Sequence, residues 1–380
     1  MIHSKLPEVG TTIFTVMSAL AREHNAINLS QGFPDFDCDP ELHDLAFRAM
    51  KEGHNQYPPM RGVDVLLDEI AKKYSALYNL PLDPREDITV TSGAAEAIYS
   101  AITAIVHPGD EVILLDPAYD LYKPAILLNG GVPRVYKLNS PHFKIDWSGV
   151  ERMVNAKTRL IIINTPHNPI GRTMKESDLK ALENLVQNTG IFVISDEVYE
   201  HLVFDGEPHE SILKYPGIFQ KGFATFSFGK TYHITGWRIG YCIAPKSLTR
   251  EFRKIHQFNV FTVPTPLQYA IAGYMKDSRH YEELPVFFQK KKEFLQNALA
   301  QTRLKPLVSE GSYFQLYDYS DISDQPDVDF VKEMTIKHGV AAIPMSVFYS
   351  DPDPQERLIR LCFGKTIETL EAAADRLRAL

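Results

Sequence analysis

The chain has 380 residues, and its 40 Lys and Arg against 48 Asp and Glu give a net charge of −8. A mildly acidic chain lacks the basic surface that non-specific binding to nucleic acid or to an anionic membrane requires. Its hydrophobic content of 44% and charged content of 23% are typical of a globular protein and exclude disorder over most of its length.

The cysteines and the apolar stretches of the sequence bear on the cellular compartment of the protein. Cys38, Cys242 and Cys362 are far apart, odd in number and form no C-x-x-C pair, which disfavours a disulfide framework or a cysteine zinc site. Residues 1–7 lack the apolar core of a secretory signal. The longest uncharged stretch, 255–275, contains prolines that disfavour a membrane helix. We therefore expect a soluble, cytoplasmic protein with no metal site.

The middle of the chain alternates short β-branched runs with longer helical patterns. We expect strands at 88–91, 111–116, 132–138, 160–163, 191–194, 223–228 and 238–243, and helices at 94–106, 119–128 and 176–187. Unbroken apolar strands that alternate with helices predict a parallel sheet buried on both faces. Ligands of such sheets bind beyond the carboxyl ends of the strands, so polar residues that directly follow a strand are candidates for the site.

The C-terminal part has a different pattern. A long charged helical pattern at 277–302 precedes short strands near 313–317, 341–343 and 358–363, with helices at 328–338 and 366–379. This pattern predicts a smaller α+β domain beside an α/β domain whose central sheet is mostly parallel. We expect an N-terminal arm at 1–40 that packs onto the rest of the molecule, a large domain at 41–280 and a small domain at 281–380.

Several common catalytic and nucleotide-binding motifs are absent. No G-x-G-x-x-G occurs, and Gly229-Lys230-Thr231 lacks the P-loop glycine because position 224 is Ala224. The S-x-x-K match at 227–230 lacks the S-D-N and K-T-G segments of serine acyl-enzymes.

Three segments that follow predicted strands carry the remaining chemistry. They are Ser-Asp-Glu-Val-Tyr at 195–199, Asn-Thr-Pro-His-Asn-Pro-Ile-Gly at 164–171, and Ser-Phe-Gly-Lys at 227–230 with Gly-Trp-Arg-Ile-Gly at 236–240. Together they offer a lysine, a carboxylate and a phosphate cradle. Pyridoxal phosphate needs all three, because its aldehyde condenses with a lysine, its pyridine nitrogen pairs with a carboxylate and its phosphate needs N–H donors and a cation.

On these segments the chain resembles the pyridoxal-phosphate-dependent aminotransferases of fold type I, class I/II. The likeness runs from Ser-Gln-Gly-Phe-Pro-Asp at 30–35 to Arg-Leu-Cys-Phe at 360–363. Segments 10–14, 195–201 and 227–233 are similar to the branch of methionine aminotransferases and kynurenine/glutamine transaminases.

The resemblance implies pyridoxal 5'-phosphate as the cofactor. It implies that Lys230 holds the cofactor covalently and then moves the substrate proton, which requires a neutral amine. Asp196 would pair with the pyridinium nitrogen, while Tyr199 and Asn168 would hydrogen-bond the phenolic oxygen. Contacts to the ring and phosphate would come from Gly93, Ala94, Ala95, Tyr119, Ser227 and Arg238, and from Tyr57, which would reach the phosphate of a neighbouring subunit.

The resemblance also implies a substrate site. Arg360 would pair with the α-carboxylate, with the backbone N–H of Gly32 and with Asn168 beside it. Ile13, Phe14, Phe33 and Phe261 are apolar candidates for the side-chain pocket, and no second arginine in these segments favours a dicarboxylate. Ordinary structural roles stay open for some of these residues: a surface salt bridge for Arg360, a helix cap for Asp196, a plain turn at 168–169, and core packing for Tyr119 and the other aromatic residues.

The sequence therefore predicts a homodimeric transaminase that moves the amino group of a neutral, methionine-like or aromatic L-amino acid to a 2-oxo acid. The two half-reactions would alternate in a ping-pong cycle between pyridoxal and pyridoxamine forms. A carbon–sulfur β-lyase that releases pyruvate and ammonia shares the scaffold and is the first alternative. A non-catalytic cofactor-binding regulator is the second, and it is disfavoured because the motifs leave no room for a DNA-binding domain.

Overall fold

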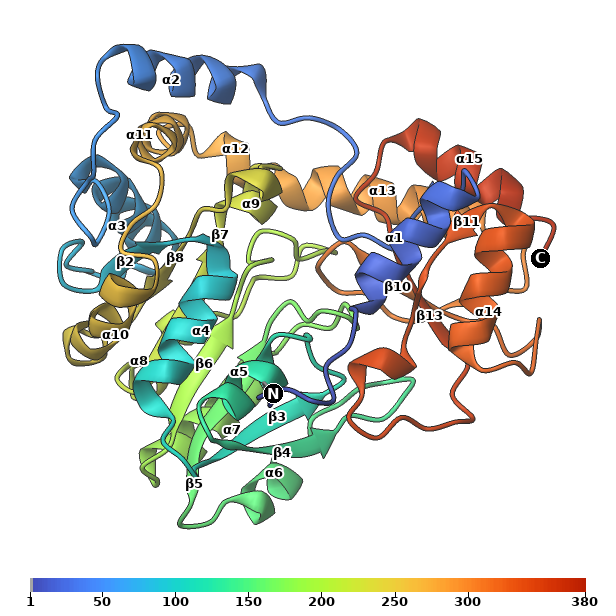
Figure 1. Ribbon diagram of the computed structural model, residues 1–380, viewed down its shortest axis with the longest axis horizontal. Coiled ribbons are helices and arrows are strands. Elements are labelled where there is room, and N and C mark those ends of the chain that lie inside the picture. Colours follow the sequence, from blue (N-terminus) through green and yellow to red (C-terminus); the bar gives the residue numbers. More distant parts are fainter. Residues whose placement is uncertain (1–2) are drawn as a thin grey trace.

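The computed structural model describes residues 3–380. Figure 1 shows a large part built on a seven-stranded sheet and a smaller part that contains the C-terminus. Between residues 3 and 380, no helix is both long enough and apolar enough to cross a lipid bilayer.

The large sheet has the strand order β2-β8-β7-β6-β5-β3-β4. Its strands are β2 (Ile88–Thr91), β3 (Glu111–Asp116), β4 (Val132–Lys137), β5 (Thr158–Asn164), β6 (Phe192–Asp196), β7 (Gly222–Ser227) and β8 (Gly240–Ile243). Strands β4, β3, β5, β6 and β7 pair in parallel, which confirms the predicted, mostly parallel sheet. Strand β8 is antiparallel to β7 and β2. Only the short helices α9 (Phe228–Thr231) and η2 (Thr235–Trp237) connect β7 to β8, too little for the long crossover that a parallel pair needs.

Successive residues of the buried strands face opposite sides of the sheet. Val112 and Leu114 belong to a core cluster with helices α4 (Gly93–Ile105), α5 (Tyr122–Leu128) and α10 (Lys246–Asn259). Ile113 and Leu115 belong to the other cluster, which continues into the C-terminal part. Helices that contribute to that second cluster include α3 (Asp64–Tyr78), α6 (Trp147–Met153), α7 (Glu176–Gln187), α8 (Pro216–Phe219) and α11 (Thr265–Tyr274). The sheet is thus covered on both faces, as the unbroken apolar strands predict.

The C-terminal part contains an antiparallel sheet of order β12-β13-β10-β9. Its strands are β9 (Lys305–Pro306), β10 (Phe314–Asp318), β12 (Ile343–Pro344) and β13 (Leu358–Cys362), with helices α13 (Leu284–Ala298), α14 (Asp327–Glu333) and α15 (Ile367–Leu377). The prediction of one helix over 277–302 was wrong, because α12 (Arg279–Glu282) ends before α13 begins with Pro285 in its first turn. Proline is tolerated there because the first N–H groups of a helix have no partner within the helix.

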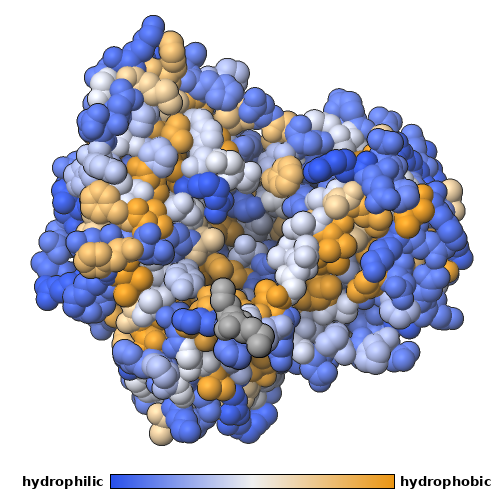
Figure 2. Space-filling view, in the orientation of Figure 1, coloured by the Kyte–Doolittle hydropathy of each residue, from blue (hydrophilic) through white to orange (hydrophobic). Residues whose placement is uncertain are grey.

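The N-terminal segment contacts both parts. Helix α1 (Ile13–Glu23) precedes β1 (Ile27–Asn28), which pairs in parallel with β11 (Val340–Ala341) of the C-terminal part. The chain then crosses to α2 (Pro40–Lys51), which lies against α11 on the large part (Figure 1). The face in Figure 2 is hollowed between the two parts. The domain boundaries themselves stay a prediction.

Candidate functional site

The candidate residues gather at one edge of the large sheet. Asp196 ends β6, Asn164 ends β5 and Ser227 ends β7, so all three stand at the carboxyl ends of neighbouring parallel strands. Because β2 and β7 are both antiparallel to β8, β2 also ends at this edge, and Gly93 follows it. This edge is where open parallel sheets bind ligands.

Asp196 is a buried carboxylate with a tyrosine partner. Its Oδ2 accepts a hydrogen bond of 2.6 Å from the hydroxyl of Tyr122. Burial raises the pKa of Asp196 to about 6, while the bond from Tyr122 and the charge of Lys230 act in the opposite direction. Above pH 6 the carboxylate is therefore ionised, and an additional cation beside it would lower its pKa further. The backbone carbonyl of Asp196 accepts from Asn164 Nδ2 at 2.8 Å. The next helix along the chain is η1 (Ile212–Lys214), so the alternative of a helix cap for Asp196 is wrong.

Lys230 lies in α9, directly after β7, and its amine is held by two oxygens. Its Nζ donates to the carbonyl of Gly32 and to the hydroxyl of Tyr313, both at 2.8 Å. Burial lowers the pKa of Lys230 to about 8, and the neighbouring guanidinium groups of Arg238 and Arg360 act in the same direction. A large part of the amine is therefore neutral near pH 8, as a nucleophile or a proton carrier requires.

Aromatic rings surround the amine. The Nζ of Lys230 lies 5.6 Å from the centre of the Tyr199 ring and 5.4 Å from that of Tyr313. Burial raises the pKa of Tyr199 above its usual range, so its hydroxyl keeps its proton and can donate a hydrogen bond. Tyr119 packs edge to face on Tyr122 with ring centres 5.6 Å apart, which places it next to the partner of Asp196.

Donors for an anion converge beside the start of α4. Gly93 opens this helix with φ +70°, and a Cβ there would lie 2.9 Å from Nη2 of Arg238. A Cβ on Gly240 would lie 2.8 Å from the backbone nitrogen of Ala94. No side chain caps α4, so its first N–H groups, including those of Ala94 and Ala95, are available with the guanidinium close by. A helix N-terminus combined with a cation binds phosphate.

Ser227 completes this cradle. It precedes α9 without capping it, and its Oγ would lie 3.3 Å from a Cβ on Gly229. At Gly93, Gly229 and Gly240 the absence of a side chain lets neighbouring groups of the cradle lie close to the backbone. Together with the Lys230 amine and the Asp196 carboxylate, these groups fit the aldehyde, the pyridine nitrogen and the phosphate of pyridoxal phosphate.

Arg360 is a buried guanidinium that lacks a carboxylate partner. Its side chain is 1% exposed on β13, which contradicts the alternative of a surface salt bridge. Its Nη1 donates to Oδ1 of Asn168 at 2.6 Å and its Nη2 to the carbonyl of Ser30 at 3.1 Å. Its Nε has no hydrogen-bond partner and no ion pair joins Arg360 to a carboxylate within residues 3–380, while the charge of Asp120 acts on it from farther away. Burial lowers its pKa to about 10, which still leaves it charged at neutral pH.

Aromatic rings pack on this guanidinium. The centre of the Phe314 ring lies 3.8 Å from its Cζ, that of Phe348 5.1 Å and that of Phe14 5.4 Å. Phe14 and Phe348 also contact each other edge to face, with ring centres 6.0 Å apart. Phe14 is therefore brought to the site, as predicted for a pocket residue.

A cavity of about 710 Å³ adjoins these rings. Its wall includes Ile13, Phe14, Tyr119, Leu127 and Phe348. Charged groups at the wall comprise three carboxylates and two amines, from Glu8, Asp116, Asp120, Lys5 and Lys123. The cavity falls in the size range of small-molecule sites and has a largely apolar wall, so it can hold a small apolar side chain.

Two predicted contacts take a different form in the structure. Gly32 presents its carbonyl to Lys230, whereas the prediction used its N–H for the substrate. Asn168 contacts Arg360 through Oδ1, while its N–H donates to Oδ1 of Asn164 at 2.7 Å. Asn168 therefore orients the guanidinium, and the roles of both residues toward ligands stay predictions.

The side chains of Tyr57, Phe33 and Phe261 contact other residues in the single chain. Tyr57 is 85% exposed and contacts Phe261 edge to face, with ring centres 5.7 Å apart. Phe33 contacts Lys365, whose Nζ lies 4.9 Å from the ring centre. Within residues 3–380, no hydrogen bond or ring contact joins these three aromatic residues to Lys230 or Arg360.

Sequence reasoning missed four residues that the structure places here: Tyr122, Tyr313, Phe314 and Phe348. Tyr122 had a weak signal in the predicted helix 119–128, where it stands three residues after Tyr119, although α5 begins only at Tyr122. The other three come from the C-terminal part, and no spacing in the sequence connects them to Lys230.

The family model for aminotransferase class I and II matches residues 24–377 of the chain. The methionine aminotransferase of Escherichia coli (strain K12) is 51% identical over 379 residues, which cover 100% of this chain and 98% of that relative. The kynurenine–oxoglutarate transaminase of Dictyostelium discoideum is 34% identical, with 98% of this chain and 94% of the relative covered.

Among solved structures, YbdL from Escherichia coli, described as having a methionine aminotransferase function, superposes with a TM-score of 0.98. That likeness covers 100% of both chains at 51% identity. The fold-type prediction is thereby confirmed over the whole chain.

Proposed function

Because the chain belongs to the class I and II aminotransferase family, we propose that it transfers the amino group of methionine, or of another neutral L-amino acid of similar shape, to a 2-oxo acid. The chain is an aminotransferase, and pyridoxal phosphate is its cofactor. The substrate class and the roles of individual residues are our proposal.

Arg360 is the observation that carries the substrate class. A buried guanidinium without an ion-pair partner is costly, because the more distant charge of Asp120 offsets only part of its desolvation. The α-carboxylate of an amino acid would supply the missing charge and the acceptor for Nε. Arg360 can present two N–H donors to it in the planar geometry that a carboxylate matches.

The cavity next to Arg360 supports an uncharged side chain. Its rings, Phe14, Phe348 and Tyr119, offer apolar contacts to a methionine-like thioether or an aromatic ring. Because three carboxylates and two amines stand at its wall, a second carboxylate on the substrate gains no net attraction there. This fits a methionine-type donor better than an aspartate-type donor.

We assign the cofactor contacts from the geometry of the site. The N-terminus of α4 from Gly93 to Ala95, with Ser227 and Arg238, would hold the phosphate. When bound, pyridoxal phosphate supplies an aldehyde that condenses with amines and a ring that withdraws electrons from the substrate carbon.

The protein groups around the cofactor would control charge and protons. The ionised carboxylate of Asp196, oriented by Tyr122, would keep the pyridine nitrogen protonated. Lys230 Nζ would bind the cofactor and, once released, take the proton from Cα of the substrate, since burial favours its neutral form. The hydroxyl of Tyr199 would donate to the phenolic oxygen, and Tyr119 would cover one face of the ring.

We also propose that two copies of the chain form a homodimer. An open groove is lined by residues 55–58 and 262–266. Three partly or largely exposed aromatic residues belong to these segments or stand next to them in the sequence: Tyr57, Phe258 and Phe261. Tyr57 and Phe258 are 85% and 86% exposed, which is unusual for large aromatic rings in a monomer and typical of a surface that a partner covers. Sedimentation of the purified protein tests this: a concentration-independent monomer would contradict it.

The substrate proposal is tested with a panel of amino donors and one common 2-oxo acid. L-methionine, L-phenylalanine, L-aspartate and L-glutamate should be compared by kcat/KM. We expect methionine to exceed aspartate by about 100-fold, equivalent to about 2.8 kcal/mol of differential transition-state binding. Equal values for methionine and aspartate would contradict the apolar pocket.

The same preparation separates transamination from the carbon–sulfur lyase alternative. The relatives reported above are named as aminotransferases, and nothing in the site favours elimination. With a cysteine S-conjugate and no oxo acid, pyruvate and ammonia released over many turnovers would identify a lyase. A single stoichiometric release of oxo acid followed by arrest is the outcome expected for an aminotransferase.

A further inference from the structure

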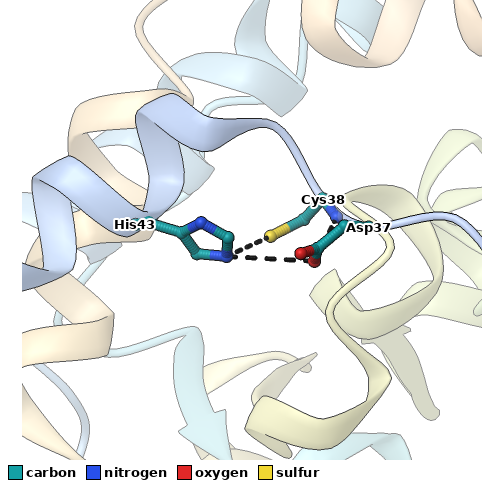
Figure 3. Close-up of side chains that lie close together, drawn as sticks. All are labelled: Asp37, Cys38 and His43. Atoms are coloured by element: carbon teal, nitrogen blue, oxygen red, sulfur yellow. Dashed lines mark hydrogen bonds and ion pairs between the residues drawn. The ribbon is translucent and has the colours of Figure 1, made fainter.

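A cluster of three potential metal ligands lies at the start of α2, outside the site described above. Cys38 Sγ is 3.2 Å from His43 Nε2, and this nitrogen is 3.9 Å from Oδ1 of Asp37 (Figure 3). One ligand atom from each of the three residues lies within 4.8 Å of those of the other two. We propose that Asp37, Cys38 and His43 form a binding site for a zinc ion.

The start of the helix explains why these side chains meet. Asp39 caps α2, its Oδ1 accepting from the N–H of Glu41 at 2.8 Å, and Pro40 occupies the first helical position. Cys38 therefore precedes the cap, and His43 is the fourth helical residue. These two positions face each other at a helix start and usually hold a pair of apolar side chains. Here they hold a thiol and an imidazole, both of which bind metals.

The donor set selects the class of metal. One sulfur, one nitrogen and one carboxylate oxygen are the ligand types that zinc accepts, whereas calcium and magnesium prefer oxygen alone. Three protein ligands with water in the fourth position would complete a tetrahedral shell. Cys38 is nearly buried, while the His43 and Asp37 side chains are 51% and 82% exposed, so an ion can reach the cluster from solvent.

The local charge also favours a cation. Asp37 accepts from the N–H of Cys38 at 2.8 Å, and Asp37 and Asp39 place negative charge beside the thiol. Zinc binding would replace the thiol proton by a sulfur–zinc bond and release that proton to solvent, with no change of oxidation state.

The cluster lies close in the chain to Gly32, the hydrogen-bond partner of Lys230. Residues 33–36 connect it to Gly32, whose carbonyl accepts from Lys230 Nζ. A bound ion would therefore fix the α2 end of the segment that spans the two parts of the molecule. No metal site was expected from the sequence, because the three cysteines lie far apart in the chain and form no C-x-x-C pair, whereas this site uses a single cysteine.

The holoenzyme tests the proposal by equilibrium dialysis against Zn²⁺, with the metal content measured per chain. We expect one zinc ion per chain, and a rise of Tm with zinc concentration because the ion binds only the folded cluster. Co²⁺ in place of Zn²⁺ should give a thiolate-to-cobalt absorption band.

Three variants decide whether this cluster is responsible. Cys38→Ser and His43→Asn should each weaken zinc binding by more than the roughly 10–100-fold that outer-shell changes cost, and Cys38→Ser should abolish the cobalt band. The control is His54→Asn, because His54 Nε2 lies 3.9 Å from Glu52 without a cysteine; its zinc affinity should be unchanged. Zinc binding that survives Cys38→Ser, or no bound zinc in the wild-type protein, would overturn the proposal. Each variant's metal-free Tm and circular dichroism establish that it is folded.

Discussion

Replacement of Arg360 by alanine should reduce kcat/KM for methionine far more than replacement of any comparable buried arginine. The guanidinium is 1% exposed, has a free Nε donor and has no carboxylate partner within residues 3–380. Loss of one partner of a buried, hydrogen-bonded charge pair costs about 2–5 kcal/mol. At about 1.4 kcal/mol per factor of ten, this predicts a loss of about 30-fold to several thousand-fold.

The assay compares L-methionine with 3-(methylthio)propylamine, the same amine without its carboxylate. If Arg360 binds the carboxylate, Arg360→Ala should lower kcat/KM for methionine by the full factor and leave the slower reaction of the amine within about threefold of the wild-type value. Arg360→Lys, which keeps the charge but loses the planar pair of donors, should fall between the two proteins.

Arg253→Ala is the matched control. Arg253 is also partly buried and donates to the carbonyl of Ile88 at 2.7 Å, but it lies on α10 and contacts none of the site residues. It should change stability with little change in kcat/KM. Equal losses for methionine and for the amine in Arg360→Ala, with unchanged cofactor content, would refute carboxylate binding by Arg360.

Three further outcomes follow from the buried polar groups. Tyr122→Phe removes the 2.6 Å hydrogen bond that lowers the pKa of Asp196. The acid limb of the pH profile of kcat/KM should therefore move to higher pH by about one to two units. An acid limb that does not move would contradict the pairing of Tyr122 with Asp196. Lys73→Met leaves the buried carboxylate of Glu200 without its ion-pair partner at 2.6 Å. The free energy of unfolding measured with urea should therefore fall by about 3–5 kcal/mol. A fall of less than about 1 kcal/mol would show that this ion pair is unimportant for stability. Burial lowers the pKa of Lys230 to about 8. The rate at which the cofactor-free protein binds pyridoxal phosphate should therefore rise about tenfold per pH unit below pH 8 and level off above it. A rate that continues to rise up to about pH 10 would indicate an ordinary lysine.

Elements of the large sheet were predictable because their signals are local. The apolar runs of β3 and β5 can be buried only between two layers, and the helix predicted at 176–187 is α7 as observed. The polar residues that end or directly follow β5, β6 and β7, including Asp196 and Lys230, were therefore placed correctly at one edge of the sheet. The direction of β8 was not predictable in this way, since a short strand has the same pattern in either orientation.

The substrate side of the site depends on contacts between distant segments. Arg360 on β13 contacts Phe14 from α1, Phe314 from the neighbouring strand β10, and Phe348, residues that stand far apart in the chain. Tyr313 reaches Lys230 only after the large part and the C-terminal part have packed together. No spacing rule within one segment predicts such contacts, so the resemblance identified Arg360 while the structure identified what surrounds it.

The visible absorption spectrum of the purified protein, before and after addition of L-methionine without any oxo acid, tests the central claim most directly. We predict a yellow protein whose band bleaches as one equivalent of the keto acid of methionine appears per chain, and a Lys230→Ala variant that shows no such turnover while keeping its fold. A protein that binds no added pyridoxal phosphate, or a Lys230→Ala variant that transaminates normally, would contradict the account.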